Sequence, residues 1–386
     1  MGCYFDYNAT TPLRQSAKSA IIEGIDRYWQ NPSSPYVSSA RAKNVLETSR
    51  ETLASLLGTQ PESVVFTGGA TEANNSIIEY LSRLSSQNQV LLLSPFEHPS
   101  VLDAARHFWG DRLRFIRSKA NGTIDLEDFS VQMKSSSIAA VSVMAVNNET
   151  GVIQPVNEIA EACAGSGVLF HCDASQWFGK LSSSRVPRCD FLVGCGHKFW
   201  GPKGAGFISL SDRSDGFCSQ FGGGQERGRR GGTENILLVL GMVEALAFAE
   251  KRLSDFASQA TYRDRFEAGL TDHIPATEIV GNTGTRLANT SFLLLPDYEN
   301  IRWVRKLDLK GFQVSTGSAC STGKTSSSPV LTALGFASEA GRKSVRVSSW
   351  ADTSERDWGN LTQAFNEVWT DFQNADGSGM TEVVSI

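Results

Sequence analysis

The sequence predicts an α/β protein built on a mainly parallel sheet, with a second, smaller domain toward its C-terminal end. Seven short runs are apolar throughout, and helical patterns lie between several of them. Strands that are apolar on both faces, with helices between them, are typical of a parallel sheet covered on both sides. At 386 residues, the chain is long enough for two domains.

The predicted elements follow this alternation along the chain. Strands are expected at 64–67, 90–94, 113–117, 139–146, 168–172, 191–194 and 205–210. Helices are expected at 70–84, 99–109, 126–133 and 156–164. A long helical pattern from roughly 234 to 259 is expected to lead into the second domain.

Composition argues against several classes of partner. A net charge of −5 gives no reason to expect nucleic acid or an anionic membrane. The one dense basic cluster, Arg227, Arg229 and Arg230, has no aromatic stripe beside it. No apolar run approaches the ~20 residues that span a bilayer. We therefore expect neither nucleic acid nor membrane as a partner.

The cysteines and the first residues indicate the cellular compartment in which the protein is expected. Seven cysteines are scattered along the chain, which resembles neither a disulfide framework nor a metal site. The start, M-G-C-Y-F-D-Y, shows no secretory signal pattern. A cytoplasmic protein without a bound metal is the expectation.

Candidate site residues follow the strands. Thr71, His98, Asn148, Asp173 and Lys198 each come just after a predicted strand. The carboxyl ends of parallel strands meet at one edge of a sheet, and ligands bind there. We therefore expect one site at this edge.

Lys198 indicates the chemistry of that site. It lies in C-G-H-K-F-W-G-P-K-G-A-G, where glycines let the backbone approach a flat cofactor. Burial lowers an ammonium pKa and frees the amine to form a Schiff base. Asp173, 25 residues earlier in H-C-D-A-S-Q, is a carboxylate that can hold a pyridinium nitrogen. This pair is what pyridoxal 5′-phosphate (PLP) chemistry requires.

Three further stretches fit that cofactor, although each also has a structural interpretation. Gly68-Gly69-Ala70-Thr71 opens a helix and, taken with the lysine, predicts a phosphate site, although such a junction alone is often only a tight turn. His98 suits a ring that stacks on the pyridine and carries protons, or a structural histidine. Asn148 suits a hydrogen bond to cofactor or substrate, or a turn.

Cys320 lies in S-T-G-S-A-C-S-T-G-K-T-S-S-S, a segment with almost no apolar anchor. Such a composition predicts a mobile loop. Because an exposed thiol is a better nucleophile than a core cysteine, Cys320 is the candidate nucleophile.

Together these motifs resemble the cysteine desulfurases of the class V aminotransferase group, of the NifS/IscS type with a long active-site loop. The matching stretches are D-Y-N-A-T-T-P at 6–12, N-P-S-S at 31–34, G-G-A-T-E-A-N-N at 68–75, E-H-P-S at 97–100, N-N-E-T-G at 147–151, D-A-S-Q at 173–176, G-H-K at 196–198, G-G-G-Q-E-R-G at 222–228, G-T-E-N at 232–235, G-S-A-C at 317–320 and V-R-V-S at 345–348.

The resemblance implies a PLP-dependent transferase of fold type I acting as a homodimer. Its large domain would span 13–258 around a mainly parallel seven-stranded sheet. Its smaller α+β domain would comprise 1–12 and 259–386 and carry the Cys320 loop.

The resemblance also implies roles for individual residues. Lys198 would form the Schiff base, Asp173 would hold the ring nitrogen, Gln176 the phenolic oxygen, and His98 would stack on the ring. The phosphate site would comprise Ala70, Thr71, Cys195, His197 and, from the other subunit, Thr233. Arg346 would clamp the substrate carboxylate with help from Asn148, since guanidinium groups bind carboxylates bidentately.

The reaction so implied takes sulfur from L-cysteine, leaving L-alanine and a persulfide on Cys320. The loop would pass that sulfur to an acceptor protein or scaffold, in iron–sulfur cluster assembly, tRNA thiolation or a dedicated biosynthesis. A PLP-dependent cysteine or cystine C–S lyase and a non-catalytic dimeric binding protein are the alternatives. The lyase needs no thiol at 320, and the binding protein needs no Lys198.

The chain departs from the family pattern at several places, among them the C-terminal tail, which does not resemble the scaffold-docking tail of the housekeeping enzymes. Cys195 stands where the family has a hydroxyl donor to the phosphate, and a thiol is a weaker donor. Tyr36 stands where a histidine is usual. Trp350 follows Arg346 closely and is expected near the substrate clamp.

Overall fold

The computed structural model describes residues 2–135, 137–317 and 328–377. The chain divides into two compact units. The first comprises residues 1–9, 149–151 and 254–386, and the second comprises 10–148 and 152–253. These boundaries lie at 9/10 and 253/254, where the sequence places them at 12/13 and 258/259.

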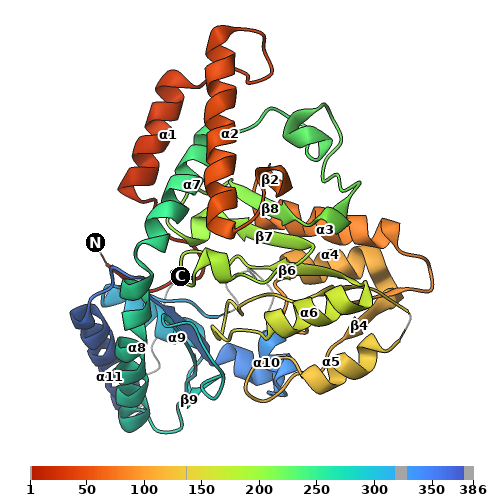
Figure 1. Ribbon diagram of the computed structural model, residues 1–386. Coiled ribbons are helices and arrows are strands. Elements are labelled where there is room, and N and C mark those ends of the chain that lie inside the picture. The colour runs from red at the N-terminus through yellow and green to blue at the C-terminus, as the bar shows by residue number, and fades with distance from the viewer. Residues whose placement is uncertain (1, 136, 318–327, 378–386) are drawn as a thin grey trace. The chain divides into compact units, whose positions relative to one another are not determined.

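The second unit contains a seven-stranded sheet (Figure 1). Its strands are β2 Val64–Thr67, β3 Val90–Leu93, β4 Leu113–Phe115, β5 Ile138–Ser142, β6 Leu169–Asp173, β7 Phe191–Cys195 and β8 Gly206–Leu210. The spatial order is β2-β8-β7-β6-β5-β3-β4. Strands β7, β6, β5, β3 and β4 pair in parallel, which confirms the mainly parallel sheet.

Strand β8 runs against its neighbours β2 and β7. Only residues 196–205 connect β7 to β8. A parallel crossover needs a dozen or more residues, so this short connection forces the chain to return antiparallel. The connection carries the Gly196-His197-Lys198 turn.

Seven helices accompany the sheet among the residues described for this unit. They are α1 Gln15–Arg27, α2 Val37–Leu57, α3 Ala70–Leu84, α4 Pro99–Trp109, α5 Leu126–Met133, α6 Val156–Ser166 and α7 Ile236–Glu250. Helices α3 and α4 pack on one face, where Ile77 and Val101 meet Leu91, Leu93 and Val193 of the strands. Leu92 and Leu192 are also buried, so both faces of these strands are covered.

The prediction of one helix over 234–259 is wrong. Helix α7 ends at Glu250 and α8, Leu253–His273, begins after a turn at Lys251 and Arg252. The amides of Lys251 and Arg252 bond to carbonyls three residues back, which tightens the last turn. No glycine or proline lies at this break, and the apolar pattern of the sequence continues across it. The sequence alone therefore does not indicate where α7 ends.

The first unit contains two small sheets and four helices among its described residues. Strand β1, Cys3–Tyr4, pairs in parallel with β11, Phe312–Gln313. The antiparallel sheet has the order β12-β10-β9, from Ser344–Ser348, Thr290–Leu294 and Glu278–Ile279. The helices are α8, α9 Asn300–Leu309, α10 Pro329–Ala333 and α11 Glu355–Gly377. Trp303, Trp358, Phe266 and Phe365 centre its core.

No helix in the described ranges is both long and apolar enough to cross a membrane.

Candidate active site

The polar residues expected at the sheet edge lie where predicted along the chain. Asp173 is the last residue of β6, and Cys195 is the last residue of β7. Gly196–Lys198 forms a 3-10 turn directly after Cys195, and His98 precedes α4 after β3. Because these strands are parallel, their carboxyl ends form one edge of the sheet.

Asn74 is the residue that connects this edge. Its Nδ2 donates to Asp173 Oδ2 at 2.8 Å and to Ser100 Oγ at 2.9 Å. Its Oδ1 lies 3.1 Å from Nε2 of His171. Asn74 is fully buried on the first turns of α3, so its amide links this helix to two other elements of the unit, β6 and α4.

The same network fixes the tautomer of His98. The backbone N–H of Ser100 donates to His98 Nδ1 at 3.1 Å, so Nδ1 is an acceptor. In the neutral ring the proton therefore resides on Nε2. Burial lowers the pKa of His98, and the nearby Lys198 lowers it further while Asp173 opposes the change. The ring is thus held neutral and oriented.

His171 is a second buried imidazole in this network. Burial lowers its pKa to about 4, with Asp173 opposing the change. An Asn74 Oδ1 acceptor requires a proton on Nε2, which leaves Nδ1 to accept from Ser142 Oγ at 2.8 Å. This chain of hydrogen bonds runs from Ser142 through His171 and Asn74 to Asp173.

Two threonines hold the turn that carries Lys198. The carbonyl of His197 accepts from the N–H of Thr11 at 2.8 Å and from its hydroxyl at 3.0 Å. Thr10 Oγ1 lies 3.2 Å from His197 Nδ1. Burial and the cations Lys198, Lys203 and Lys180 lower the pKa of His197 to about 3. The A-T-T-P motif therefore positions the lysine turn.

The N-terminus of α3 lies beside Cys195. Gly69 precedes the helix with φ +143°, a conformation that suits glycine, and no side chain caps the helix. The first amides of a helix lack partners within it. Burial raises the pKa of the Cys195 thiol, while the nearby Lys198 and the Ala70 amide lower it in part. Ala70 and Cys195 thus share one junction, at which Thr71 is exposed.

Gln176 is oriented by a lysine. Lys180 Nζ donates to Gln176 Oε1, and both side chains are buried. With its carbonyl end held in this way, the amide directs its Nε2 donors elsewhere. A donor at this position suits an oxygen acceptor such as a phenolate.

Glu97 is a buried carboxyl next to His98 in the chain. Its Oε1 accepts from the Met144 amide at 2.6 Å. Burial raises the pKa of Glu97 to about 8, and the nearby Asp173 raises it further. At neutral pH Glu97 is therefore mostly protonated.

Arg346 belongs to the first unit, on β12. Its Nη2 lies 2.6 Å from Asp6 Oδ1, and its side chain is 3 % exposed. Burial raises the pKa of Glu149, which Ser328 and Arg346 lower in part. Ser328 Oγ donates to Glu149 Oε2 at 2.6 Å. Cys320 lies outside the described residues.

Three further predicted positions are Thr233, Asn148 and Trp350. Thr233 is exposed just before α7, and Asn148 is half-buried in the loop after β5. Trp350 is a core residue of the first unit, stacked on Tyr7 at 6.1 Å and edge-on to Phe256. Its packing accounts for the bulky residue at this position.

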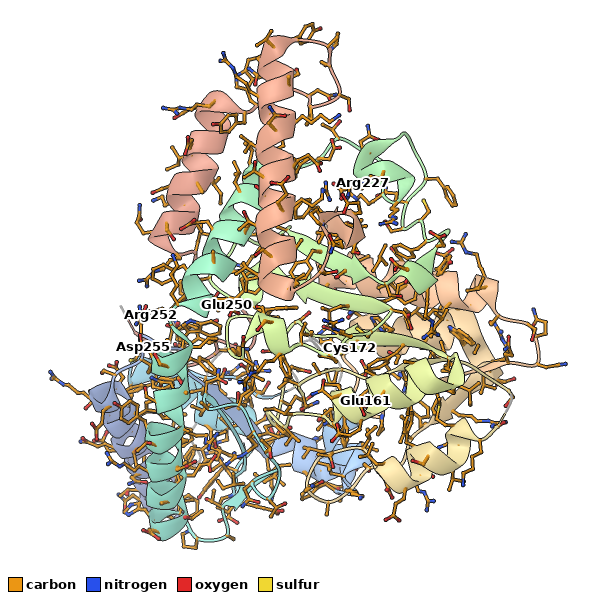
Figure 2. All side chains as sticks on the ribbon, in the orientation of Figure 1. Glu161, Cys172, Arg227, Glu250, Arg252 and Asp255 are labelled. Atoms are coloured by element: carbon orange, nitrogen blue, oxygen red, sulfur yellow. The ribbon has the colours of Figure 1, made fainter. Side chains whose placement is uncertain are left out.

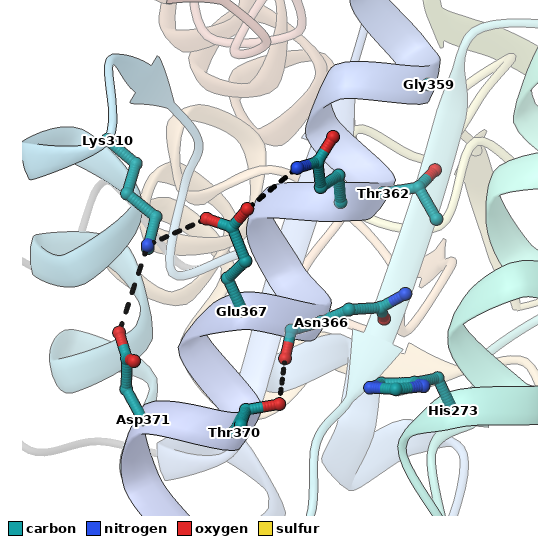
Figure 3. Close-up of a pocket in the computed structure, with 9 residues that line it drawn as sticks. His273, Lys310, Gly359, Thr362, Asn366, Glu367, Thr370 and Asp371 are labelled. Carbon is teal, nitrogen blue, oxygen red and sulfur yellow. Dashed lines mark hydrogen bonds and ion pairs between the residues drawn. The ribbon is translucent and has the colours of Figure 1, made fainter.

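A polar pocket of about 660 Å³ lies on the first unit (Figure 3). It is lined by His273, Lys310, Gly359, Thr362, Gln363, Asn366, Glu367, Thr370 and Asp371. None of the predicted site residues is among them, and Lys310 is paired with Glu367 and Asp371.

Sequence reasoning missed Asn74, His171, Ser100, Lys180 and Glu97. For two of them, the spacing in the sequence indicates a place beside a predicted site residue. His171 and Asp173 are two apart on one strand and so share a face. Asn74 lies three residues after Thr71 on a helix, which places it on the same side.

The sequence profile of the class-V aminotransferases matches residues 3–359. The chain belongs to this family. Among class-V relatives, a cysteine desulfurase from Enterobacter agglomerans is 36% identical over 358 residues, which span 92% of this chain and 89% of that protein. The solved structure of a NifS-like protein is similar, with a TM-score of 0.87, 27% identity, and coverage of 96% of this chain and 100% of that one. A structure described as SspA in complex with cysteine has a TM-score of 0.77 at 28% identity, covering 89% and 98%.

The residues present fit PLP, the cofactor of this class-V family. Asp173 is a buried carboxylate whose oxygens accept from Asn74 and Ser175, as a partner for a protonated ring nitrogen requires. The uncapped N-terminus of α3 suits a phosphate. Lys198 would supply the amine. The donor set therefore matches each polar part of the cofactor.

Proposed function

We propose that this protein is a PLP-dependent cysteine desulfurase, which converts L-cysteine to L-alanine and keeps the sulfur as a persulfide on Cys320. The observation that carries the proposal is the buried network in which Asn74 joins Asp173 to the Ser100–His98 pair. It orients an anionic carboxylate and a neutral imidazole together, beside a lysine that influences the pKa of His98.

When bound, PLP supplies an electron sink for charge that develops at Cα of the amino acid. Asp173 would keep its ring nitrogen protonated, and Gln176 would donate to its phenolic oxygen. Ala70, Thr71, Cys195 and His197 would hold its phosphate. Lys198 would bind the cofactor covalently and then move the Cα proton. His98, neutral and fixed in tautomer, would stack on the ring.

Arg346 would bind the substrate carboxylate, with Asn148 assisting. Asp6 holds one arm of the guanidinium in the first unit. That contact fixes the plane of the fork, which suits bidentate binding of a second carboxylate. The substrate amino acid would thereby be oriented by its carboxylate.

Cys320 would complete the reaction. Its sulfur forms an S–S bond to the sulfur of cysteine while the C–S bond breaks, and that electron pair passes to the substrate carbon. Protonation of this carbon gives alanine, and the enzyme retains the persulfide. An acceptor protein or scaffold would then take the sulfur. We place this chemistry in the cytoplasm, with iron–sulfur cluster assembly as one use.

A homodimer is part of the proposal, and the surface of the second unit supports it. Large apolar side chains are exposed on α1, on α2 and between them, including Ile25, Trp29, Tyr36 and Val37. Trp29 is 71% exposed and Val37 is 74% exposed. Large apolar side chains at this exposure, close together in the chain, suit a surface that another protein covers. A second copy would cover them and would receive Thr233.

Peptide mapping tests the cofactor assignment. Borohydride reduction of the PLP-loaded protein should fix the label on Lys198. The label should persist in Lys203→Arg, a control on the same loop, and should be absent from Lys198→Ala. Label on Lys180 or Lys203, or no bound cofactor, would refute the proposal.

A further inference from the structure

The segment between β8 and α7 contains a strained backbone that glycine does not explain. Glu226 and Arg227 are consecutive left-handed residues, with φ of +48° and +57°. This conformation is costly for L-residues other than glycine. Glycines stand nearby at 222–224, 228, 231 and 232, yet not at these two positions. Contacts of the side chains must therefore maintain the conformation.

Glu226 makes those contacts. Its carboxylate accepts two bonds from Arg50, at 2.7 and 2.8 Å, and a third from the Phe66 amide at 2.9 Å. Both side chains are nearly fully buried, at 3% and 1% exposure. Arg50 Nη1 also donates to the Val64 carbonyl at 2.8 Å, which fixes the pair to β2. Removing Arg50 would leave the buried Glu226 carboxylate without its ion-pair partner, whereas Arg50 also contacts Glu47 at 3.3 Å.

The segment then closes on itself just before Thr233. The amide of Gly231 donates to the Gln220 carbonyl at 2.7 Å, and that of Gly232 to the Gly222 carbonyl at 3.2 Å. A Cβ on Gly231 would lie 2.2 Å from the Gly222 oxygen, so only glycine fits. Thr233 is the next residue and is exposed. Its position therefore follows from the conformation of residues 219–232.

The arginine cluster fastens the same segment. Arg227 and Arg229 donate to the carbonyls of Pro61 and Glu62, and Figure 2 labels Arg227 in this part of the second unit. Arg230 Nε donates to Glu72 Oε1 at 3.0 Å. Glu72 Oε2 in turn accepts from the Gly68 amide at 2.9 Å, at the entrance to α3. The segment is thus tied to the junction assigned to the phosphate.

We propose that Glu226 is a positioning residue. Its buried pair with Arg50 holds residues 219–232 in the strained conformation that presents Thr233 to the cofactor phosphate of a second copy. The part of this inference that concerns Thr233 rests on the proposed function. The part that concerns the segment itself does not.

Limited trypsin digestion of the cofactor-free protein tests the segment. Glu226→Gln keeps the shape of the side chain but removes its charge, and Arg50→Lys keeps the charge but loses the bidentate fork. Cleavage after Arg227, Arg229 and Arg230 should be at least tenfold faster in both variants than in the wild type. Glu79→Gln, which breaks the exposed Arg83–Glu79 pair, is the control and should match the wild type.

Dissociation of PLP from the loaded enzyme tests the consequence. Glu226→Gln should release PLP about tenfold faster, with KM for L-cysteine little changed. Thr233→Ala should reproduce the faster release without the faster cleavage. If both Glu226→Gln and Arg50→Lys fold and resist trypsin like the wild type, the inference is wrong. If Glu226→Gln does not fold, the cleavage rate of Arg50→Lys alone tests the inference. If the Glu226 and Arg50 variants are cleaved faster but Thr233→Ala releases PLP at the wild-type rate, the role of Thr233 alone is wrong.

Discussion

The side-chain amide of Asn74 donates to Asp173 at 2.8 Å while its oxygen faces His171 at 3.1 Å. One amide therefore sets the orientation of the carboxylate at the end of β6 and the protonation of a buried imidazole. Its second donation, to Ser100, reaches the residue that fixes the tautomer of His98. Asp173 and His98 are consequently oriented as a unit rather than separately.

Asn74→Ala should weaken PLP binding. It leaves Asp173 Oδ2 and His171 Nε2 without this partner, and an unsatisfied buried group costs about 1–3 kcal/mol. We expect PLP affinity to fall by about tenfold or more, measured by equilibrium titration of the cofactor-free protein. Asn121→Ala, in a turn of the same unit, should leave the affinity unchanged. Equal affinities for all three proteins would show that Asp173 needs no such support.

Glu97→Gln should change how stability depends on pH. The folded-state pKa of Glu97 is raised to about 8, so the folded protein keeps a proton that the unfolded chain releases above its ordinary pKa. The stability that this proton contributes to the folded protein is fully present below about pH 4.5 and is lost as pH rises toward about 8. Glutamine mimics the protonated carboxyl and cannot ionise, so Glu97→Gln does not lose this stability as pH rises.

The measurement is the thermal unfolding midpoint of both cofactor-free proteins from pH 5 to pH 9. Glu97→Gln should gain relative to the wild type as pH rises, and the gain should level off above about pH 8. Contributions from His98 and His171 are common to both proteins and largely cancel in the difference. A difference that stays constant with pH would mean that Glu97 is ionised in the folded protein.

Cys195→Ser should bind PLP more tightly. Serine restores a hydroxyl at the junction with Ala70, and a neutral hydrogen bond is worth about 1 kcal/mol, or about fivefold in affinity. Cys163→Ser, in the buried apolar face of α6, is the matched control and should not tighten binding. Unchanged or weaker binding in Cys195→Ser would show that this side chain does not reach the phosphate.

Arg346→Lys should raise KM for L-cysteine by about tenfold or more. Lysine keeps the charge but offers no planar fork, so it cannot bind Asp6 and a substrate carboxylate in the same geometry. PLP affinity should stay unchanged, since Arg346 is assigned to the substrate alone. Steady-state kinetics measures the effect on substrate binding, and a parallel cofactor titration measures the effect on PLP binding. A normal KM would remove Arg346 from substrate binding.

The sequence was informative where chemistry depends on local position. Asp173, Cys195 and Lys198 could be placed because each ends or follows a strand whose apolar pattern is plain. The direction of β8 was not evident, because it depends on the length of one connection. The break after Glu250 carries no glycine or proline. Asn74 and Glu226 act through contacts 99 and 176 residues away, and no local pattern reports such contacts.

The central claim is that sulfur leaves cysteine by transfer to Cys320. Mass spectrometry of the PLP-loaded enzyme after one exposure to L-cysteine, without reductant, tests it directly. We expect one extra sulfur on the Cys320 peptide and alanine as the carbon product, with both absent from Cys320→Ala although it still binds L-cysteine. Pyruvate and ammonia from both proteins, with Cys320 unmodified, would contradict the account and identify a C–S lyase.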